Sequence, residues 1–158
     1  MTMGPGEVLC VGIGSPQGDD QAGWLVIDAL QNLSRQRVCL RKAAYPGELL
    51  DWLEPQGTLW IVDACRGGGK PGDWDCWHWP TEELPASLSR GTHDLGLAAV
   101  LQWGAALGRM PEEVLVWGIR IDSAVVGGQP TGPTLRAVAE VAAEMSRLWT
   151  QADANSGT

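Results

Sequence analysis

The stretch EVLCVGIGSPQGDD, residues 7–20, decides the fold that we predict. Its first part, residues 7–14, is an apolar run that ends in glycine, which is typical of a strand buried on both faces of a sheet. Residues 19–34 follow, with apolar side chains at helical spacing. A buried strand that leads through a glycine-containing turn into a helix is the opening unit of an α/β sheet.

The alternation of strands and helices continues along the chain. We expect further strands at residues 38–44, 58–65, 73–79 and 114–121. We expect further helices at residues 46–53, 93–107 and 133–149. The connection RGGGKPG, residues 66–72, is too short to contain a crossover helix, so the strand after it should be an antiparallel edge strand. The sequence therefore predicts an α/β fold with three layers: a mostly parallel sheet of about five strands, helices on both faces and one antiparallel strand.

Length and composition indicate one folded domain, residues 1–158, with a core at residues 7–150 and frayed ends. The net charge is −8, and a negative surface repels phosphate, so we expect no nucleic-acid partner. The chain contains no apolar run of 18 residues, and residues 1–7 lack the basic and apolar segments of a signal peptide. We therefore expect a cytoplasmic protein without a membrane segment, and we expect it to be a monomer.

The four cysteines, Cys10, Cys39, Cys65 and Cys76, are widely spaced and form no CxxC pair, so we expect free thiols. Cys76 and His78, with Cys65 nearby, raise the alternative of a zinc site. Their spacing matches no zinc motif, and the segment CWHW alternates as a strand does, which favours side chains on a strand surface.

Three polar segments should meet at the carboxyl edge of the sheet, where α/β proteins place their sites. Asp19 and Asp20 open the first helix, Asp63 lies near the end of an apolar strand, and His93 opens a later helix. A buried carboxylate such as that of Asp63 is costly unless it is paired or bound to a metal. A helix start favours the neutral imidazole that a metal requires. Two carboxylates and one imidazole would form a divalent-cation site with open coordination positions.

Each of these residues also has a purely structural interpretation. Asp19 can cap the first helix, Asp20 can interact with the positive end of that helix, and Asp63 can bond a neighbouring loop. His93 can be a capping or surface histidine. The loop at residues 80–92 has little pattern and leads into His93, so we expect it to be mobile, to lie near the site and to hold a substrate.

Two other kinds of site fit the sequence less well. Gly12, Gly14 and Gly18 do not have GxGxxG spacing, and carboxylates occupy the helix start at which a pyrophosphate would bind. Nucleotide binding is therefore disfavoured. No serine lies in a GxSxG motif, which argues against a serine hydrolase.

Short motifs in a fixed order resemble those of the hydrogenase maturation protease family over residues 7–150. The matching segments are Gly12-x-Gly14 with Asp19-Asp20-x-x-Gly23, Val62-Asp63-Ala64, Thr92-His93-Asp94-x-Gly96-Leu97, and the late strand Val114-Leu115-Val116-Trp117-Gly118-Ile119 preceded by Pro111. The family usually has Asn where this chain has Ser15, and the stretch that leads to the acidic pair is shorter here.

The resemblance implies an enzyme, an aspartyl-type endopeptidase that removes the C-terminal extension of a nickel–iron hydrogenase large-subunit precursor after nickel insertion. It implies that Asp20, Asp63 and His93 bind nickel and serve catalysis, with Asp19 as the alternative to Asp20. The nickel would come with the substrate, and no organic cofactor is expected. Two alternatives stay open: a non-catalytic nickel-site checkpoint or chaperone, and a small-molecule amidohydrolase on the same scaffold.

Overall fold

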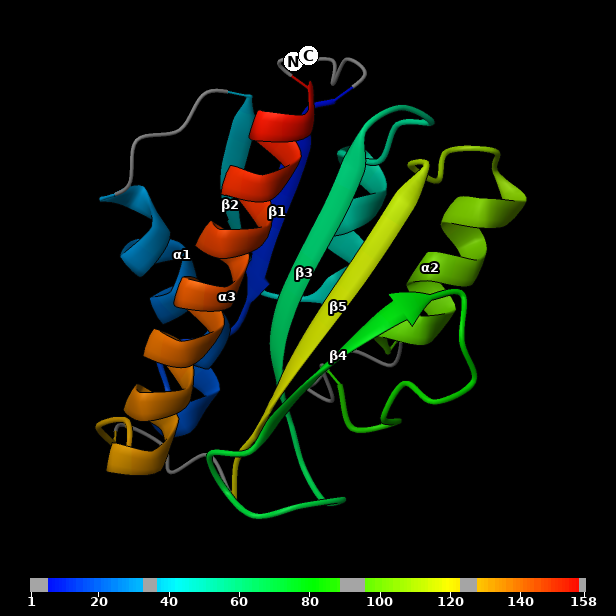
Figure 1. The fold of residues 1–158 in the computed structure, drawn as a ribbon. Helices are drawn as coiled ribbons and strands as arrows, with labels where there is room; N and C mark the ends of the chain where they lie inside the picture. The colour runs from blue at the N-terminus through cyan, green and yellow to red at the C-terminus, as the bar shows by residue number, and fades with distance from the viewer. Residues whose placement is uncertain (1–5, 33–36, 89–95, 123–127, 157–158) are drawn as a thin grey trace.

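The structure, a computed structural model, describes residues 6–32, 37–88, 96–122 and 128–156 (Figure 1). Its centre is a five-stranded sheet in the order β2-β1-β3-β5-β4. The strands are β1 (Val8–Ile13), β2 (Val38–Ala43), β3 (Thr58–Cys65), β4 (Trp74–Trp79) and β5 (Glu113–Arg120). Neighbouring strands are parallel except β4, which runs antiparallel to β5 at the edge. The predicted mixed α/β sheet is therefore confirmed.

Strand β1 lies inside the sheet, between β2 and β3. All six of its residues are buried, and none has a polar side chain other than a thiol. Such a strand can lose contact with water on both faces at no polar cost, which is why its apolar run predicts a central position correctly.

Helices cover both faces of the sheet (Figure 1). α1 (Ala22–Gln31) and α3 (Gly132–Ser156) pack on one face, and α2 (Leu97–Ala106) packs on the other with the 3-10 helix η2 (Pro46–Asp51). Successive side chains of a strand point to opposite faces, so each face has its own core. The core under α1 and α3 includes Val8, Cys10, Trp60, Val62 and Trp117. The core under α2 includes Leu9, Val11, Ile61, Cys65, Leu101 and Val116.

Helix α1 lies directly on the sheet because two glycines leave no room for side chains. A Cβ on Gly23 would lie 2.2 Å from the carbonyl oxygen of Ile13 and 2.7 Å from that of Val62. A Cβ on Gly12 would lie 2.1 Å from the carbonyl oxygen of Gly23. These separations are far below van der Waals contact, so only glycine permits this approach. The turn between β1 and α1 is held against the sheet as a result.

Helix boundaries differ from the predicted ones, most clearly at the first and last helices. The segment predicted as a helix from residue 19 begins as the 3-10 helix η1 (Gly18–Gln21), and α1 starts at Ala22. The tail at residues 152–158 was expected to be frayed, but α3 continues as far as Ser156. Alanines in this tail favour the helix. Among the described residues, no helix is long and apolar enough to cross a membrane.

Candidate functional site

Asp63 is a buried carboxylate near the carboxyl end of β3, with 2% of the residue exposed. Its neighbours at a spacing of two residues, Ile61 and Cys65, belong to the core under α2, so its side chain points to the α2 face. Its Oδ1 accepts a 2.8 Å hydrogen bond from the backbone N–H of Ala64. The burial that made Asp63 a candidate in the sequence is therefore present in the structure.

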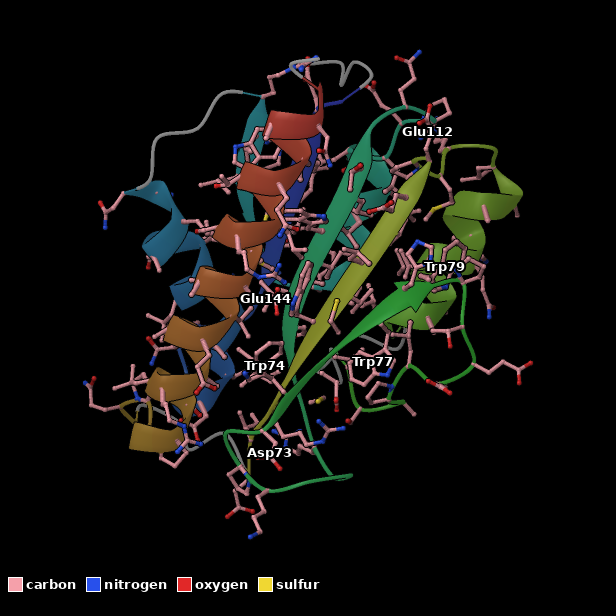
Figure 2. The ribbon with its side chains drawn as sticks, viewed as in Figure 1. Asp73, Trp74, Trp77, Trp79, Glu112 and Glu144 are labelled. Carbon is pink, nitrogen blue, oxygen red and sulfur yellow. The ribbon has the colours of Figure 1, made fainter. Side chains whose placement is uncertain are left out.

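A second carboxylate lies across the sheet from Asp63 on the same face. Gly118 of β5 pairs with Asp63 on one side and with Asp75 of β4 on the other. Gly118 has no side chain, and a Cβ there would lie 2.8 Å from the ring of Trp77 and 3.1 Å from Sγ of Cys65. The ring of Trp77 therefore fills the space above Gly118. Figure 2 shows Trp77 near the middle of β4.

Arg120 ends β5 on this same face, paired with Cys65 of β3. The residue is 8% exposed. Its Nη1 donates to Oδ2 of Asp75 at 2.5 Å, and its Nε donates to the carbonyl oxygen of Gly67 at 3.0 Å. We did not predict Arg120 or Asp75 as site residues. The signal that identified Asp63, a charge at the end of an apolar strand, is also present at Arg120.

Asp19 does not cap the first helix, and that interpretation is wrong. Neither η1 nor α1 has a side-chain hydrogen bond at its N-cap. The carboxylate of Asp19 instead accepts hydrogen bonds from Thr131, at 2.6 Å from the backbone N–H and 3.0 Å from Oγ1. Asp19 is 4% exposed. Its charge therefore lies at the start of α3, where a helix favours an anion.

Asp20 is half-buried in η1, directly after Asp19. Its backbone is fixed, since its N–H donates to the carbonyl oxygen of Gln17 and its own carbonyl oxygen accepts from Ser15. Within the described part of the chain, the Asp20 carboxylate makes no hydrogen bond or ion pair. Of the two acidic residues, Asp20 is thus the one whose carboxylate is not committed to another part of the protein, which favours it over Asp19 as a ligand.

His93 lies outside the described residues, so its position relative to Asp20 and Asp63 stays a prediction. The helix that follows it, α2, begins at Leu97 and packs on the face toward which Asp63 points. Among the described residues, no group of three or more His, Cys, Asp or Glu side chains could hold a metal ion. The predicted nickel site needs His93 as its third member and is therefore not tested by this arrangement.

The described part of the loop predicted at residues 80–92 lies beside the strand that carries Asp63. Oγ of Ser87 accepts a hydrogen bond from the N–H of Arg66 at 2.8 Å and donates to the Arg66 carbonyl oxygen at 2.9 Å. Leu88 is buried in the core under α2. The loop thus packs at the end of β3, on the face of Asp63, and its mobility stays a prediction.

The four cysteines are free, as predicted. Cys65 points to the α2 face, whereas Cys76 shares the opposite face of β4 with Trp74, whose Nε1 donates to Glu140 of α3. A zinc site that uses both thiols is therefore excluded. Burial raises the pKa of Cys65 to about 11, and nearby Arg120 opposes this rise while Asp63 and Asp75 add to it.

Several solved structures share this fold over most of their length. The hydrogenase maturating endopeptidase HybD from E. coli is 26% identical and has a TM-score of 0.69 over 89% of each chain. An endopeptidase from Escherichia coli is 25% identical, with a TM-score of 0.74 over 90% of this chain and 91% of that chain. The NiFe hydrogenase maturation protease HycI from Thermococcus kodakarensis is 21% identical, with a TM-score of 0.69 over 93% and 94%, and supports the fold alone. No family model matches the chain, and no curated protein matches its sequence.

The fold, together with the two endopeptidases that are at least 25% identical, defines the class of protein: this chain is a peptidase, a hydrolase built on a mixed α/β sheet. Within that class it resembles the hydrogenase maturation proteases, which confirms the resemblance carried by its sequence motifs. The carboxyl edge that holds Asp63 is accordingly where its peptidase chemistry is expected.

Proposed function

We propose that this chain removes the C-terminal extension of a nickel–iron hydrogenase large-subunit precursor after nickel has been inserted. We further propose that it recognises the nickel of that substrate through Asp20, Asp63 and His93. The observation that carries the proposal is Asp63, a carboxylate buried near the end of an apolar strand, on the face covered by the helix that follows His93. The neighbour HybD, a hydrogenase maturating endopeptidase that is 26% identical, supports the substrate class.

The three side chains suit a metal that arrives with the substrate. Carboxylate oxygens and an imidazole nitrogen are good ligands for a divalent first-row metal, and three protein ligands leave positions for those of the substrate. Nickel held there can polarise the scissile carbonyl, or it can orient the tail while a carboxylate acts as general base toward water. Both routes use the same residues, Asp20 and Asp63 being the candidate bases.

The proposed partner is therefore the precursor itself, and no organic cofactor takes part. We propose a cytoplasmic location, because the precursor would receive its nickel there. The non-catalytic alternative, a nickel-site checkpoint, would bind the same precursor and leave it uncut, so the mass of the product separates the two functions.

The test is incubation of the protein with a large-subunit precursor in nickel-loaded and nickel-free form, followed by intact-mass measurement. We expect loss of a C-terminal peptide from the nickel-loaded form only. Asp63→Asn keeps the size of the side chain and should lower the cleavage rate by at least about 100-fold, by loss of a ligand or general base. Asp28→Asn is the matched control, because Asp28 lies exposed on α1 and pairs with Lys42.

Three results would count against the proposal. Binding of the nickel-loaded precursor without any loss of mass would favour the checkpoint. Equal cleavage of the nickel-free precursor would remove nickel recognition. Normal cleavage by Asp63→Asn would remove Asp63 from the site.

A further inference from the structure

A pocket of about 600 Å³ lies between β4, the glycine-rich segment that follows β3, and the loop that contains Ser87. Its size falls within the range of small-ligand pockets. Arg120 and Trp77 line it from the sheet, and both are on the face of Asp63 by strand register. An unfolded tail fits such a space, whereas the folded body of a protein substrate does not.

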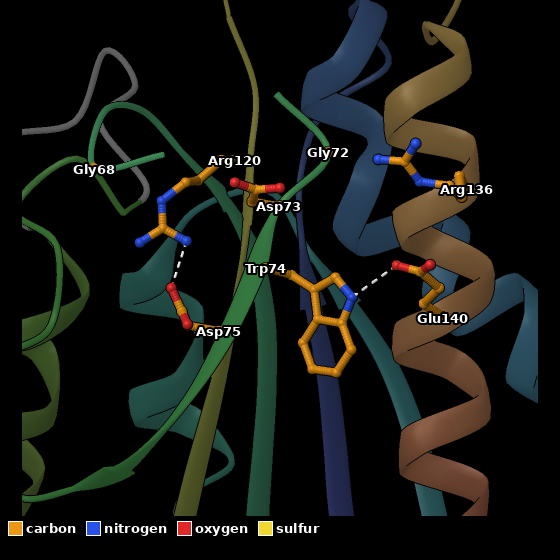
Figure 3. A pocket seen from close by; sticks show the side chains of 8 residues that line it. All are labelled: Gly68, Gly72, Asp73, Trp74, Asp75, Arg120, Arg136 and Glu140. Atoms are coloured by element: carbon orange, nitrogen blue, oxygen red, sulfur yellow. Dashed lines mark hydrogen bonds and ion pairs between the residues drawn. The ribbon is translucent and has the colours of Figure 1, made fainter. Parts of the chain in front are cut away.

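The glycine-rich segment is shaped around Arg120. Gly67 and Gly68 have φ angles of 78° and 77°, a conformation that side chains disfavour. A Cβ on Gly68 would lie 3.3 Å from Nη2 of Arg120, and a Cβ on Gly69 would lie 2.6 Å from its Cδ. With Asp75 on its other side, the guanidinium has one fixed orientation. Figure 3 shows a second, adjacent pocket that Arg120 and Asp75 also line; in it Arg120 and Asp75 are joined on one side of β4, and Trp74 is joined to Glu140 on the other.

The fixed guanidinium of Arg120 still has N–H groups that can donate hydrogen bonds to a ligand. Arginine has five N–H donors, and within the described residues only Nε and Nη1 have protein acceptors, Gly67 and Asp75. A peptide carbonyl oxygen is a suitable acceptor for the others. Because the guanidinium is already buried and oriented, the arginine side chain loses little entropy when a ligand binds to it.

The charges of the pocket indicate what kind of peptide it accepts. Its lining contains two cations, Arg66 and Arg120, and two anions, Asp75 and Glu83. These charges cancel, so a charged ligand side chain would meet no net opposite charge. Trp77 and Pro85 offer apolar surface beside the donors. A main chain with small uncharged side chains matches both features.

We propose that this pocket holds the extension of the substrate as an extended, uncharged peptide, with Arg120 donating to its main-chain carbonyl oxygens. This inference rests on the proposed function and names a substrate-binding residue outside the predicted triad. The pocket wall is continuous with the strand that carries Asp63, because Arg66 of the wall directly follows Cys65 at the end of β3. This continuity supports the inference.

The test measures KM and kcat separately with the nickel-loaded precursor. Arg120→Gln should raise KM about tenfold, the loss of one charge-assisted hydrogen bond, while kcat changes by less than about twofold. Arg136→Gln is the matched control, since Arg136 is exposed on α3 and does not line this pocket. Ala86→Trp fills the pocket from an exposed position without removing a hydrogen bond, and it should raise KM as well. Ala143→Trp, at an exposed position of α3, is its control.

The outcomes separate this inference from the proposed function. If the wild type cleaves and neither Arg120→Gln nor Ala86→Trp raises KM, the pocket inference is overturned and the proposed function stands. If the wild type leaves the precursor uncut, the proposed function fails and the inference fails with it. If Arg120→Gln does not fold, the KM of Ala86→Trp decides the question alone.

Discussion

At the scale of residues, the candidate site is marked by buried charges at or near the ends of strands. Asp63 lies near the end of β3 and Arg120 ends β5, and both point to the face that α2 covers. Burying a charge costs free energy unless the protein compensates it. Arg120 is compensated by Asp75 and by the Gly67 carbonyl oxygen, which also orients it. Compensation by fixed partners leaves such groups pre-organised for a ligand.

Asp19 should stabilise the protein through α3 rather than act on the substrate directly. Asp19→Ala removes the acceptor of the Thr131 N–H and Oγ1, so we expect the free energy of unfolding to fall by about 1–3 kcal/mol. Asp51→Ala, at an exposed position of η2, should change it by less than about 0.5 kcal/mol. Urea denaturation of both variants measures the difference, and equal stability of the two would refute the role of Asp19.

Cys10 should make the stability depend on pH in the alkaline range. Burial, with a smaller contribution from Cys39, raises its pKa from 9.0 to about 12. The folded state thus holds this proton more tightly than the unfolded state. The associated stability is fully present below about pH 9 and is lost as the pH rises toward 12.

Comparison with Cys10→Ala isolates this effect from the titration of lysines and tyrosine. The variant loses packing at every pH. Above pH 9, however, the free energy of unfolding should fall less steeply in the variant than in the wild type, by about 1.4 kcal/mol per pH unit. Urea unfolding at pH 7.5, 9.0 and about 10.5 gives the slope of the free energy of unfolding against pH for the wild type and for the variant. Parallel slopes for wild type and variant would contradict the shifted thiol pKa.

At the scale of elements, periodicity predicts the succession of strands and helices along the chain, because each element buries its own apolar side chains. The antiparallel β4 follows from the length of the connection before it. The start of α1 could not be predicted, since the segment around Asp19 forms a 3-10 turn held by Thr131, which is 112 residues away in the sequence. Local pattern carries no information about such a distant partner.

The same limit applies to the site. Asp63 could be predicted because a lone carboxylate in an apolar strand is visible in one segment. The pairing of Arg120 with Asp75 depends on the register of β4 against β5 and on the glycine-rich segment between β3 and β4. That register becomes visible only when the strands are placed side by side.

Gly23 should be indispensable for the position of α1. In Gly23→Ala the new Cβ would overlap backbone oxygens of β1 and β3, which cannot move aside as flexible side chains can. We expect the variant to lose about 2 kcal/mol or more of stability, through overpacking. Gly132→Ala is the control, because a Cβ on Gly132 at the start of α3 meets nothing within 4 Å. Similar melting temperatures for the two variants would contradict the close approach of α1.

At the scale of the whole molecule, the sheet separates the candidate site from the ends of the described chain. The parallel strands and the start of α3 place Asp63, Arg120 and η1 at one edge, while β1 begins and α3 ends at the opposite edge (Figure 1). Purification tags at either end therefore leave the carboxyl edge accessible to a protein substrate. The experiments with the precursor can use tagged protein for this reason.

We predict that the protein is a monomer in solution. Among the described residues, the exposed large apolar side chains are spread over several elements: Trp103 on α2, Leu107 directly after this helix, Leu135 on α3 and Tyr45 before η2. Since α2 and α3 cover opposite faces of the sheet, Leu135 is separated from Trp103 and Leu107, and a stable dimer needs a larger apolar patch than one helix end offers. The net charge of −8 adds repulsion between copies. Light scattering after size exclusion at pH 7.5 should give the monomer mass of 16.9 kDa. A doubled mass that Trp103→Gln reduces to that value would show instead that α2 is a dimer interface.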